Sequence, residues 1–144
     1  MTTLRLDTRP PRAVVLPRDE MAFRWRYRDL LLKRTLTTVF RPGDRIYPNW
    51  RGYCEGEIVT ARIIRMPGSD ERGVPPQFDE LRIPIRIRAI SVSSIDALGR
   101  DAFSGSSPDV QDRMSLAEHL RHIYGRPLSA FGNQVTRIAF AYIG

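Results

Sequence analysis

Residues 30–51 read LLLKRTLTTVFRPGDRIYPNWR, and this stretch decides how we expect the chain to fold. It begins as the apolar end of a helix, passes through a cluster of threonines, and turns at Pro42-Gly43-Asp44, an order of residues typical of a tight turn. An alternating segment follows at once, as in a small barrel. The stretch also gathers four arginines and several hydroxyl groups where a helix gives way to a strand, so we expect an anion-binding site here.

The neighbouring segments predict the other strands of a sheet. Residues 23–34 predict a short strand that runs into a helix of about two turns. Residues 55–64 are rich in β-branched side chains, which is typical of a central strand. Residues 81–90 alternate with a period of two, so that apolar side chains lie on one face and arginines on the other. Pro84 favours an edge position for this strand, because it has no N–H to donate.

Two helix starts precede the last strand. Ser107-Pro108-Asp109 has the order of an N-cap followed by proline, and Ser115 to Glu118 have the spacing of a capping box. We expect the second helix to end at Gly125 with four apolar side chains on one face, Leu116, Leu120, Ile123 and Tyr124. Residues 134–143 predict the final strand. About five strands, two or three short helices and no long βα alternation predict an α+β fold built on a small mixed β-barrel.

Length and composition favour one domain. A chain of 144 residues with 42% hydrophobic residues is long enough for a single core. We expect residues 1–21 to form an N-terminal arm or edge strand and residues 22–144 to form the domain. No run approaches the roughly 20 apolar residues that span a bilayer, and residues 1–20 contain no apolar signal-peptide core. We therefore expect a cytoplasmic protein without a membrane partner, and the single cysteine, Cys54, excludes an internal disulfide.

The charge of the chain points to a polyanion. The formal net charge is +7 and the pI is near 10.5, and Lys33 is the only lysine among the 23 basic residues. The planar guanidinium of arginine matches phosphate and stacks on bases better than an ammonium group does. The composition therefore favours RNA or a nucleotide as the partner. A GC-rich genome would also replace lysine with arginine, which leaves an interaction module without a nucleic-acid ligand as an alternative.

Most catalytic templates are missing from the sequence. It contains no phosphate-binding loop of the Gly-x-x-x-x-Gly-Lys-Ser/Thr type, no Gly-x-Ser-x-Gly elbow and no His-Glu-x-x-His motif. The two histidines, His119 and His122, have no cysteine nearby and make a poor metal site. We expect His119 to be solvated and His122 to pack beside Tyr124, and we expect neither a metal nor a cofactor.

The segment around Arg34 resembles the ASCH domains, small barrels related to the PUA fold. The hallmark of these domains is Gly-x-Lys-x-x-Glu-x-Arg between the first helix and the next strand, followed after a gap by a Gly-Asp turn. In this chain the hallmark corresponds to residues 32–39, LKRTLTTV, with Gly43-Asp44 as the turn. The order of elements agrees over residues 22–143, since ASCH-like domains commonly end in a Leu-x-x-x-Leu-x-x-x-Tyr helix before a last strand. The resemblance implies a PUA-like barrel that binds RNA or a nucleotide-like ligand.

The motif is only partly kept. Arg34 stands where the family has lysine, Thr37 where it has glutamate, and Val39 where it has arginine, although Arg41 follows two residues on. One branch of the family hydrolyses acetylated cytidine, and Thr35 and Thr37 match its two threonines. Arginine stays charged at any accessible pH, so Arg34 can hold an anion but cannot abstract a proton. This difference favours binding over hydrolysis.

The expected site lies in a basic cleft between the first helix and the following loop. Arg34 and Arg41 would contact a phosphate or a carbonyl oxygen, Thr35 and Thr37 would donate hydrogen bonds, and Trp50 or Tyr53 would stack on an unpaired base. The full expected ligand-binding set is Arg34, Thr35, Thr37, Arg41, Trp50, Arg51 and Tyr53. The sequence is equally compatible with a purely structural role, in which Trp50 and Tyr53 plug the open end of the barrel and do not stack on a base.

An ASCH-type hydrolase stays open as the alternative, either an amidohydrolase on a modified nucleoside or a small ribonuclease. Its catalytic residues are unknown, and the candidates are Lys33 and Thr37. The acid or base would come from one of four carboxylates that no spacing distinguishes, Glu55, Glu57, Asp109 and Asp112.

Overall fold

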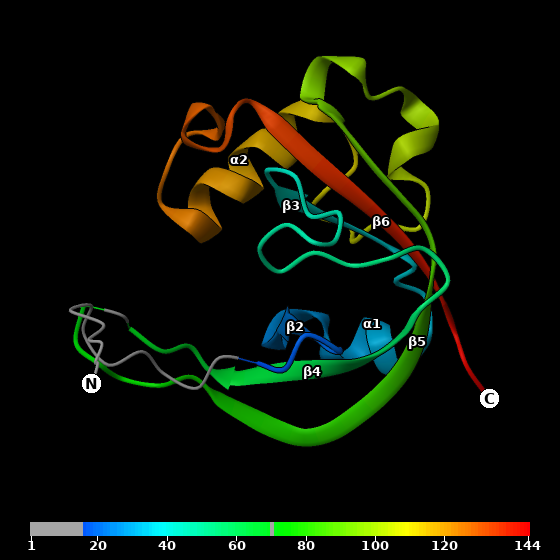
Figure 1. Ribbon diagram of the computed structural model, residues 1–144, viewed down its shortest axis with the longest axis vertical. Coiled ribbons are helices and arrows are strands. Elements are labelled where there is room, and N and C mark those ends of the chain that lie inside the picture. Colours follow the sequence, from blue (N-terminus) through cyan, green and yellow to red (C-terminus); the bar gives the residue numbers. More distant parts are fainter. Residues whose placement is uncertain (1–15, 70) are drawn as a thin grey trace.

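The structure, a computed structural model, describes residues 16–69 and 71–144. Its centre is a mixed five-stranded sheet that curls into a half-barrel (Figure 1). The strands follow the order β2 (Glu20–Arg24), β4 (Ile58–Met66), β5 (Gln77–Ser94), β6 (Gln134–Tyr142) and β3 (Thr38–Pro42). The pair β2 and β4 is parallel, and the other three pairs are antiparallel. The expected α+β class and small barrel-like sheet are confirmed. Residues 1–15 of the expected arm lie outside the described residues.

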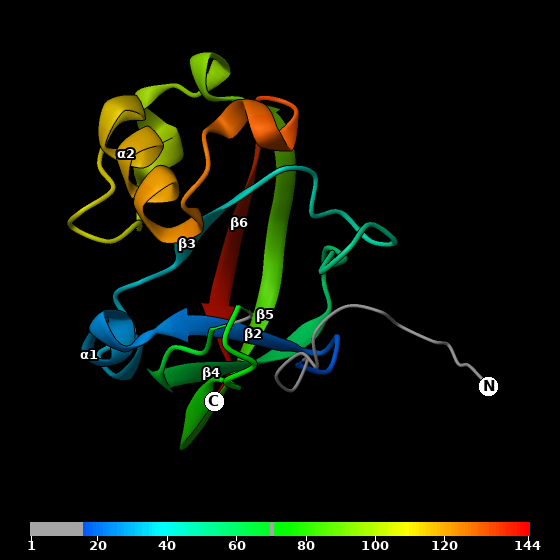
Figure 2. The same cartoon turned by 90° about the vertical axis from the view of Figure 1, so that its left-hand side faces the viewer.

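Helices lie at both ends of the sheet (Figure 2). The short helix α1 (Arg28–Leu32) follows β2 through a 3₁₀ turn, η1 (Trp25–Tyr27), and α2 (Arg113–Tyr124) lies beside β3 and β6. Three further 3₁₀ turns complete the elements, η2 (Ile95–Ala97), η3 (Arg100–Phe103) and η4 (Leu128–Phe131). In the part of the chain that is described, no helix has the length and apolarity needed to cross a membrane.

The long strand β5 is the middle strand of the sheet, which corrects the edge position suggested by Pro84. Pro84 has no N–H to donate, and its nitrogen faces β6 at the place where β6 ends. The proline is tolerated in the middle strand for this reason. Tyr142, the last residue of β6, pairs with Ile85, and the N–H of Ile143 donates to the Pro84 carbonyl at 3.4 Å. The register against β6 shifts between Ile87 and Ala89, and such a bulge helps the strand to bend.

Two apolar clusters support the two ends of the molecule. The first fills the half-barrel and includes Phe23, Ile85 and Phe140; the second lies under α2 and includes Phe40 and Leu116. Tyr27 belongs to the first cluster, on the side that faces α2. A polar cleft can therefore form between the half-barrel, which holds the first cluster, and α2, which covers the second.

Helix α2 begins earlier than the capping-box spacing predicts. Asp112 is the N-cap: its side chain accepts from the Ser115 N–H at 2.8 Å, while the Ser115 hydroxyl oxygen accepts from the Asp112 N–H at 3.0 Å. Ser115 is therefore the third helical residue, and the Ser107-Pro108 segment forms a turn. The predicted end at Gly125 is confirmed by its φ of 65° and its bond to the Arg121 carbonyl.

Candidate functional site

A cleft of about 560 Å³ lies between the free edge of β2, the loop of residues 45–53 and the last turns of α2. In Figure 1 this loop runs between α2 and β2. The lining residues are mainly arginines and aromatic side chains. The arginines are Arg18, Arg24, Arg41, Arg45 and Arg51, and the rings include Phe23, Tyr27, Tyr47, Trp50, Tyr53 and Tyr124.

Arg45 is the most unusual of these residues, because it is only 5% exposed. Its backbone N–H donates to the Thr136 hydroxyl at 2.8 Å, and its carbonyl accepts from the Tyr53 N–H at 2.9 Å, which fixes it against β6 and the loop. Its guanidinium lies 5.0 Å from the centre of the Trp50 ring. Among residues 16–69 and 71–144, no carboxylate forms an ion pair with it. A buried charge without a counterion is unfavourable, so this position calls for an anion.

The surroundings of Arg45 are positive. Burial lowers the pKa of Arg45 from its ordinary value, and the charges of Arg41 and Arg51 lower it further. Tyr124, partly through a hydrogen bond, acts in the opposite direction and raises the pKa. The Arg51 guanidinium also lies 4.5 Å from the centre of the Trp50 ring. Three guanidinium groups thus gather around one end of the cleft.

Glu20, which lines the cleft, and Glu57 already have arginine partners. Glu20 accepts from Arg62 at 2.9 Å and from Arg82 at 3.0 Å, and Glu57 accepts from Arg18 at 2.7 Å. Within the described part of the chain, no carboxylate forms an ion pair with Arg41, Arg45 or Arg51. The net field of the cleft therefore favours an anionic ligand.

Arg41 and Tyr53 close the open seam of the half-barrel, where β2 and β3 are the two edge strands. The Arg41 Nη2 donates to the Ala22 carbonyl at 2.9 Å, and the Tyr53 hydroxyl donates to the Glu20 carbonyl at 2.9 Å. Tyr53 is 7% exposed and forms part of the wall. Trp50, at 63% exposed, lies at the rim instead of plugging the barrel.

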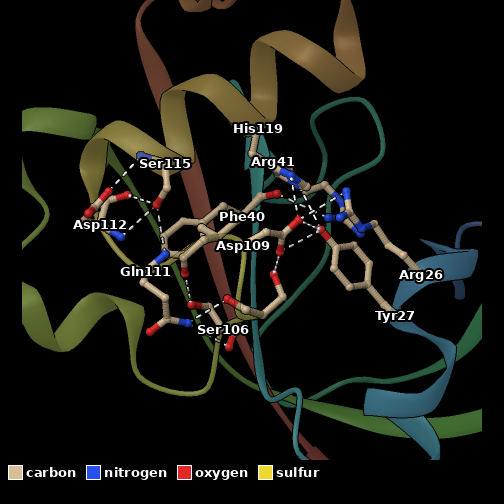
Figure 3. A network of polar contacts seen from close by, with 12 residues as sticks. Arg26, Tyr27, Phe40, Arg41, Ser106, Asp109, Gln111, Asp112, Ser115 and His119 are labelled. Carbon is tan, nitrogen blue, oxygen red and sulfur yellow. Dashed lines mark hydrogen bonds and ion pairs between the residues drawn. The ribbon is translucent and has the colours of Figure 1, made fainter.

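A second polar group reaches the same cleft from its α2 side (Figure 3). The Tyr27 hydroxyl lies 3.2 Å from His119 Nε2 and 3.2 Å from Asp109 Oδ2, and His119 Nδ1 lies 3.5 Å from the same carboxylate. Asp109 also accepts a hydrogen bond from Ser107. Tyr27 and His119 line the cleft, so this network joins the half-barrel to α2 at the cleft wall.

Burial and charge set the protonation of this network. Burial lowers the pKa of His119, and the positive charge of Arg41 lowers it further. The negative charge of Asp109 acts in the opposite direction. Burial alone would raise the pKa of Asp109, but the Ser107 hydrogen bond and the charge of His119 hold it below its usual value. Burial also raises the pKa of Tyr27. The imidazole is therefore neutral and the carboxylate charged at neutral pH.

These directions predict how stability depends on pH. Below about 6.5, the ordinary pKa of histidine, the unfolded chain takes up a proton that folded His119 resists, so stability falls as the pH drops. Asp109 adds a second loss from its ordinary pKa near 4 downwards, as the pH falls through its lower folded value. Melting temperatures measured between pH 7.5 and pH 3 should show both losses. His119→Gln should remove the first loss and reduce the second, because the charge of His119 helps to lower the pKa of Asp109. A wild-type melting temperature that is flat between pH 7.5 and pH 5 would contradict this account.

The two histidines occupy the reverse of the expected positions. The His119 side chain is 14% exposed and belongs to the network, whereas His122 is exposed. No group of three or more His, Cys, Asp or Glu side chains is placed to hold a metal ion in the ranges that the structure describes.

The structure separates the expected ligand-binding residues into two groups. Arg41, Trp50, Arg51 and Tyr53 line the cleft, and Arg34, Thr35 and Thr37 do not. The Arg34 guanidinium donates to the Gly144 carbonyl at 2.9 Å, and Thr35 is exposed. Thr37 is half-buried against Gly105, whose carbonyl accepts from the Thr37 N–H at 2.9 Å. Lys33, the other catalytic candidate, is exposed and also lies outside the cleft.

The backbone conformation at Arg34 explains why its side chain does not reach the cleft. The end of α1 is a Schellman motif, in which the Thr35 N–H donates to the Leu30 carbonyl at 2.9 Å and the Arg34 N–H donates to the Leu31 carbonyl at 3.1 Å. Arg34 takes the left-handed position of this motif with φ 62°, a conformation that glycine adopts more easily.

Arg34→Gly is therefore expected to stabilise the protein by about 0.5–1 kcal/mol and to leave ligand binding unchanged. Urea denaturation and ligand titration of the variant measure the two effects. Loss of stability, or weaker binding, would contradict this interpretation of Arg34. Gly125→Ala is the matched reverse change, since Gly125 has φ 65° and no neighbour within 4 Å of an added Cβ; it should lose a similar amount of stability.

Sequence reasoning missed Arg45, Tyr27 and His119 as site residues. Arg45 stood in the stretch that was singled out, but nothing in the sequence marks it as buried. Tyr27 and His119 lie 92 residues apart, and no local pattern connects them.

Comparison with protein-family models, with curated proteins and with solved structures found no match.

Proposed function

We propose that this chain binds RNA or a nucleotide-like ligand in the cleft around Arg45. The observation that carries the proposal is a buried guanidinium without a carboxylate partner in the described residues, placed directly beside an exposed tryptophan. A phosphate supplies the missing counterion, and a base supplies a flat apolar surface for the aromatic rim. A nucleotide combines both groups in one molecule.

Other cleft residues support the same ligand class. Arg41 and Arg51 add positive charge near Arg45, and Tyr47 and Trp50 are 51% and 63% exposed at the rim. Exposed aromatic side chains next to guanidinium groups are typical of surfaces that bind single-stranded nucleic acid. The ligand would therefore place phosphate inward and base outward.

Fluorescence titration tests the proposal. Trp25 and Trp50 are the two tryptophans, so a Trp25→Phe background leaves Trp50 at the cleft as the reporter. We expect AMP or a short single-stranded RNA to change the Trp50 emission. The logarithm of the RNA affinity should fall linearly with the logarithm of salt concentration, with a slope of about −0.7 for each phosphate contacted. Arg100→Met, an exposed arginine on η3 outside the cleft, is the control.

The absence of binding by both AMP and RNA at low salt would contradict the proposal. The interaction module without a nucleic-acid ligand would then be the remaining interpretation. Binding that is unaffected by salt would equally argue against phosphate contacts.

An ASCH-type hydrolase is the second candidate, and the network of Tyr27, His119 and Asp109 is the observation that favours it. A neutral imidazole that is oriented by a carboxylate and lines a cleft is a suitable general base. We expect any turnover of acetylated cytidine or of short RNA to be lost in His119→Gln and kept in Lys33→Ala. Turnover lost in Lys33→Ala alone would instead place the chemistry at the end of α1.

We also propose that the half-barrel is a PUA-like barrel of the ASCH type. The support is the resemblance of residues 32–39 to the ASCH motif and the position of α2 as the last α-helix before the final strand. Superposition of an experimental structure on a solved ASCH domain tests this relation, and a different strand order in the two sheets would contradict it.

A further inference from the structure

The depth of Arg45 limits which part of a nucleotide can reach it. Arg45 is 5% exposed, whereas Trp50, whose ring lies 5.0 Å from its guanidinium, is 63% exposed. An anion therefore meets Trp50 at the rim before it meets Arg45. The group that neutralises Arg45 must be compact enough to enter past the indole ring.

The loop that carries these residues is held in a fixed shape. Its two ends are joined by the bond from the Tyr47 N–H to the Tyr53 carbonyl at 3.1 Å, and its tip by the bond from the Gly52 N–H to the Asn49 carbonyl at 2.8 Å. A Cβ at Gly52 would come within 2.7 Å of the Asn49 carbonyl oxygen, so the backbone is closely packed there. These bonds hold the loop that carries Arg45 and Trp50 in one backbone shape.

This shape distinguishes the end of a nucleotide chain from its interior. An internal phosphodiester has two ester arms, and both must leave the pocket if the chain continues on each side. A terminal phosphate has one ester arm, so it can reach the recessed Arg45 guanidinium while the rest of the ligand stays at the exposed rim beside Trp50.

The charge around Arg45 favours the same group. A terminal phosphate carries about −1.5 to −2 charge at pH 7 and three acceptor oxygens, whereas a phosphodiester carries a single charge. Three guanidinium groups, those of Arg41, Arg45 and Arg51, share this end of the cleft without an ion-paired carboxylate in the described parts of the chain. The more highly charged group compensates them better.

We infer that the cleft recognises a terminal phosphate, held by Arg45 with Arg41 and Arg51, and that the attached nucleoside lies against Tyr47 and Trp50. This inference rests on the proposed function, since it names the part of the nucleotide that the Arg45 cleft selects. The source of the phosphate is the end of an RNA strand or a mononucleotide.

Matched ligands test the inference on the unmodified protein. One RNA hexamer is titrated in three forms, with a 5′-phosphate, with a 3′-phosphate and with hydroxyl groups at both ends, and AMP is compared with adenosine at the same salt concentration. We expect at least one phosphate-ended hexamer to bind about tenfold or more tightly than the hydroxyl-ended one. We expect AMP to bind more tightly than adenosine by a similar factor. The position of the preferred phosphate tells which end of a strand is recognised.

The outcomes separate this inference from the proposed function. Equal binding of all three hexamers would overturn the terminal-phosphate inference and leave RNA binding intact. No binding by any hexamer, AMP or adenosine would overturn both. In Arg45→Met the preference for the phosphate-ended ligand should disappear, and in Arg100→Met it should persist. The comparison of ligands on the wild-type protein needs no variant, so the test holds even if Arg45→Met fails to fold.

Discussion

Arg45→Met is expected to abolish the binding of phosphorylated ligands and to stabilise the unliganded protein. Arg45 is buried with its pKa lowered, first by burial and then by the neighbouring arginines, so its charge opposes folding at every accessible pH. Methionine matches the unbranched stem of the arginine side chain and carries no charge. We expect about 1–3 kcal/mol of added stability, in the range seen when buried charges give way to apolar side chains. Affinity for the phosphorylated ligand should fall by about a hundredfold or more, so that no binding is detected at ligand concentrations that half-saturate the wild type.

Thermal unfolding with and without ligand measures both effects. The wild type should gain stability from AMP or RNA, because a ligand that binds only the folded state raises the melting temperature. The variant should start from a higher melting temperature and gain nothing. If Arg45→Met lowers the melting temperature of the unliganded protein, then Arg45 serves the fold and not a ligand.

Arg41→Met is expected to weaken both stability and binding. Its guanidinium donates to the Ala22 carbonyl at 2.9 Å, so the change leaves this edge carbonyl of β2 without its donor. The loss should cost about 1–3 kcal/mol of folding stability, and removal of one cation should lower affinity by about tenfold. Urea denaturation and ligand titration measure the two changes.

Arg51→Met is the matched control for Arg41→Met. Arg51 is exposed and lines the same cleft, so its loss should weaken binding by a similar factor with a stability change within about 0.5 kcal/mol. A stable Arg41→Met variant would contradict the role of Arg41 in closing the seam between β2 and β3.

Much of the fold follows from local patterns in the sequence. The alternation of residues 81–90 and 134–143 predicts β5 and β6, and Gly125 predicts the end of α2, because in each case one residue period or one backbone conformation decides the outcome. The start of α2 was missed by three residues, since Ser115 can serve either as an N-cap or as the third residue of a capping box that Asp112 begins.

Of the candidate site, only the residues in or next to the loop of residues 45–53 could be predicted from the sequence. The aromatic and basic composition of residues 41–53 pointed to Arg41, Trp50, Arg51 and Tyr53, which do line the cleft. Arg34 was expected to join them because it is close in sequence, but its left-handed backbone directs it to the chain end near Gly144. The burial of Arg45 depends on β6 and on Tyr124, which lie more than 70 residues away along the chain.

The most direct test of the central claim is a calorimetric titration of a short phosphorylated RNA into three proteins, the wild type, Arg45→Met and Arg34→Met, at about 50 mM salt. We predict that the wild type and Arg34→Met bind with similar affinity and that Arg45→Met does not bind. Binding that survives in Arg45→Met and is lost in Arg34→Met would contradict the account and move the site to the end of α1.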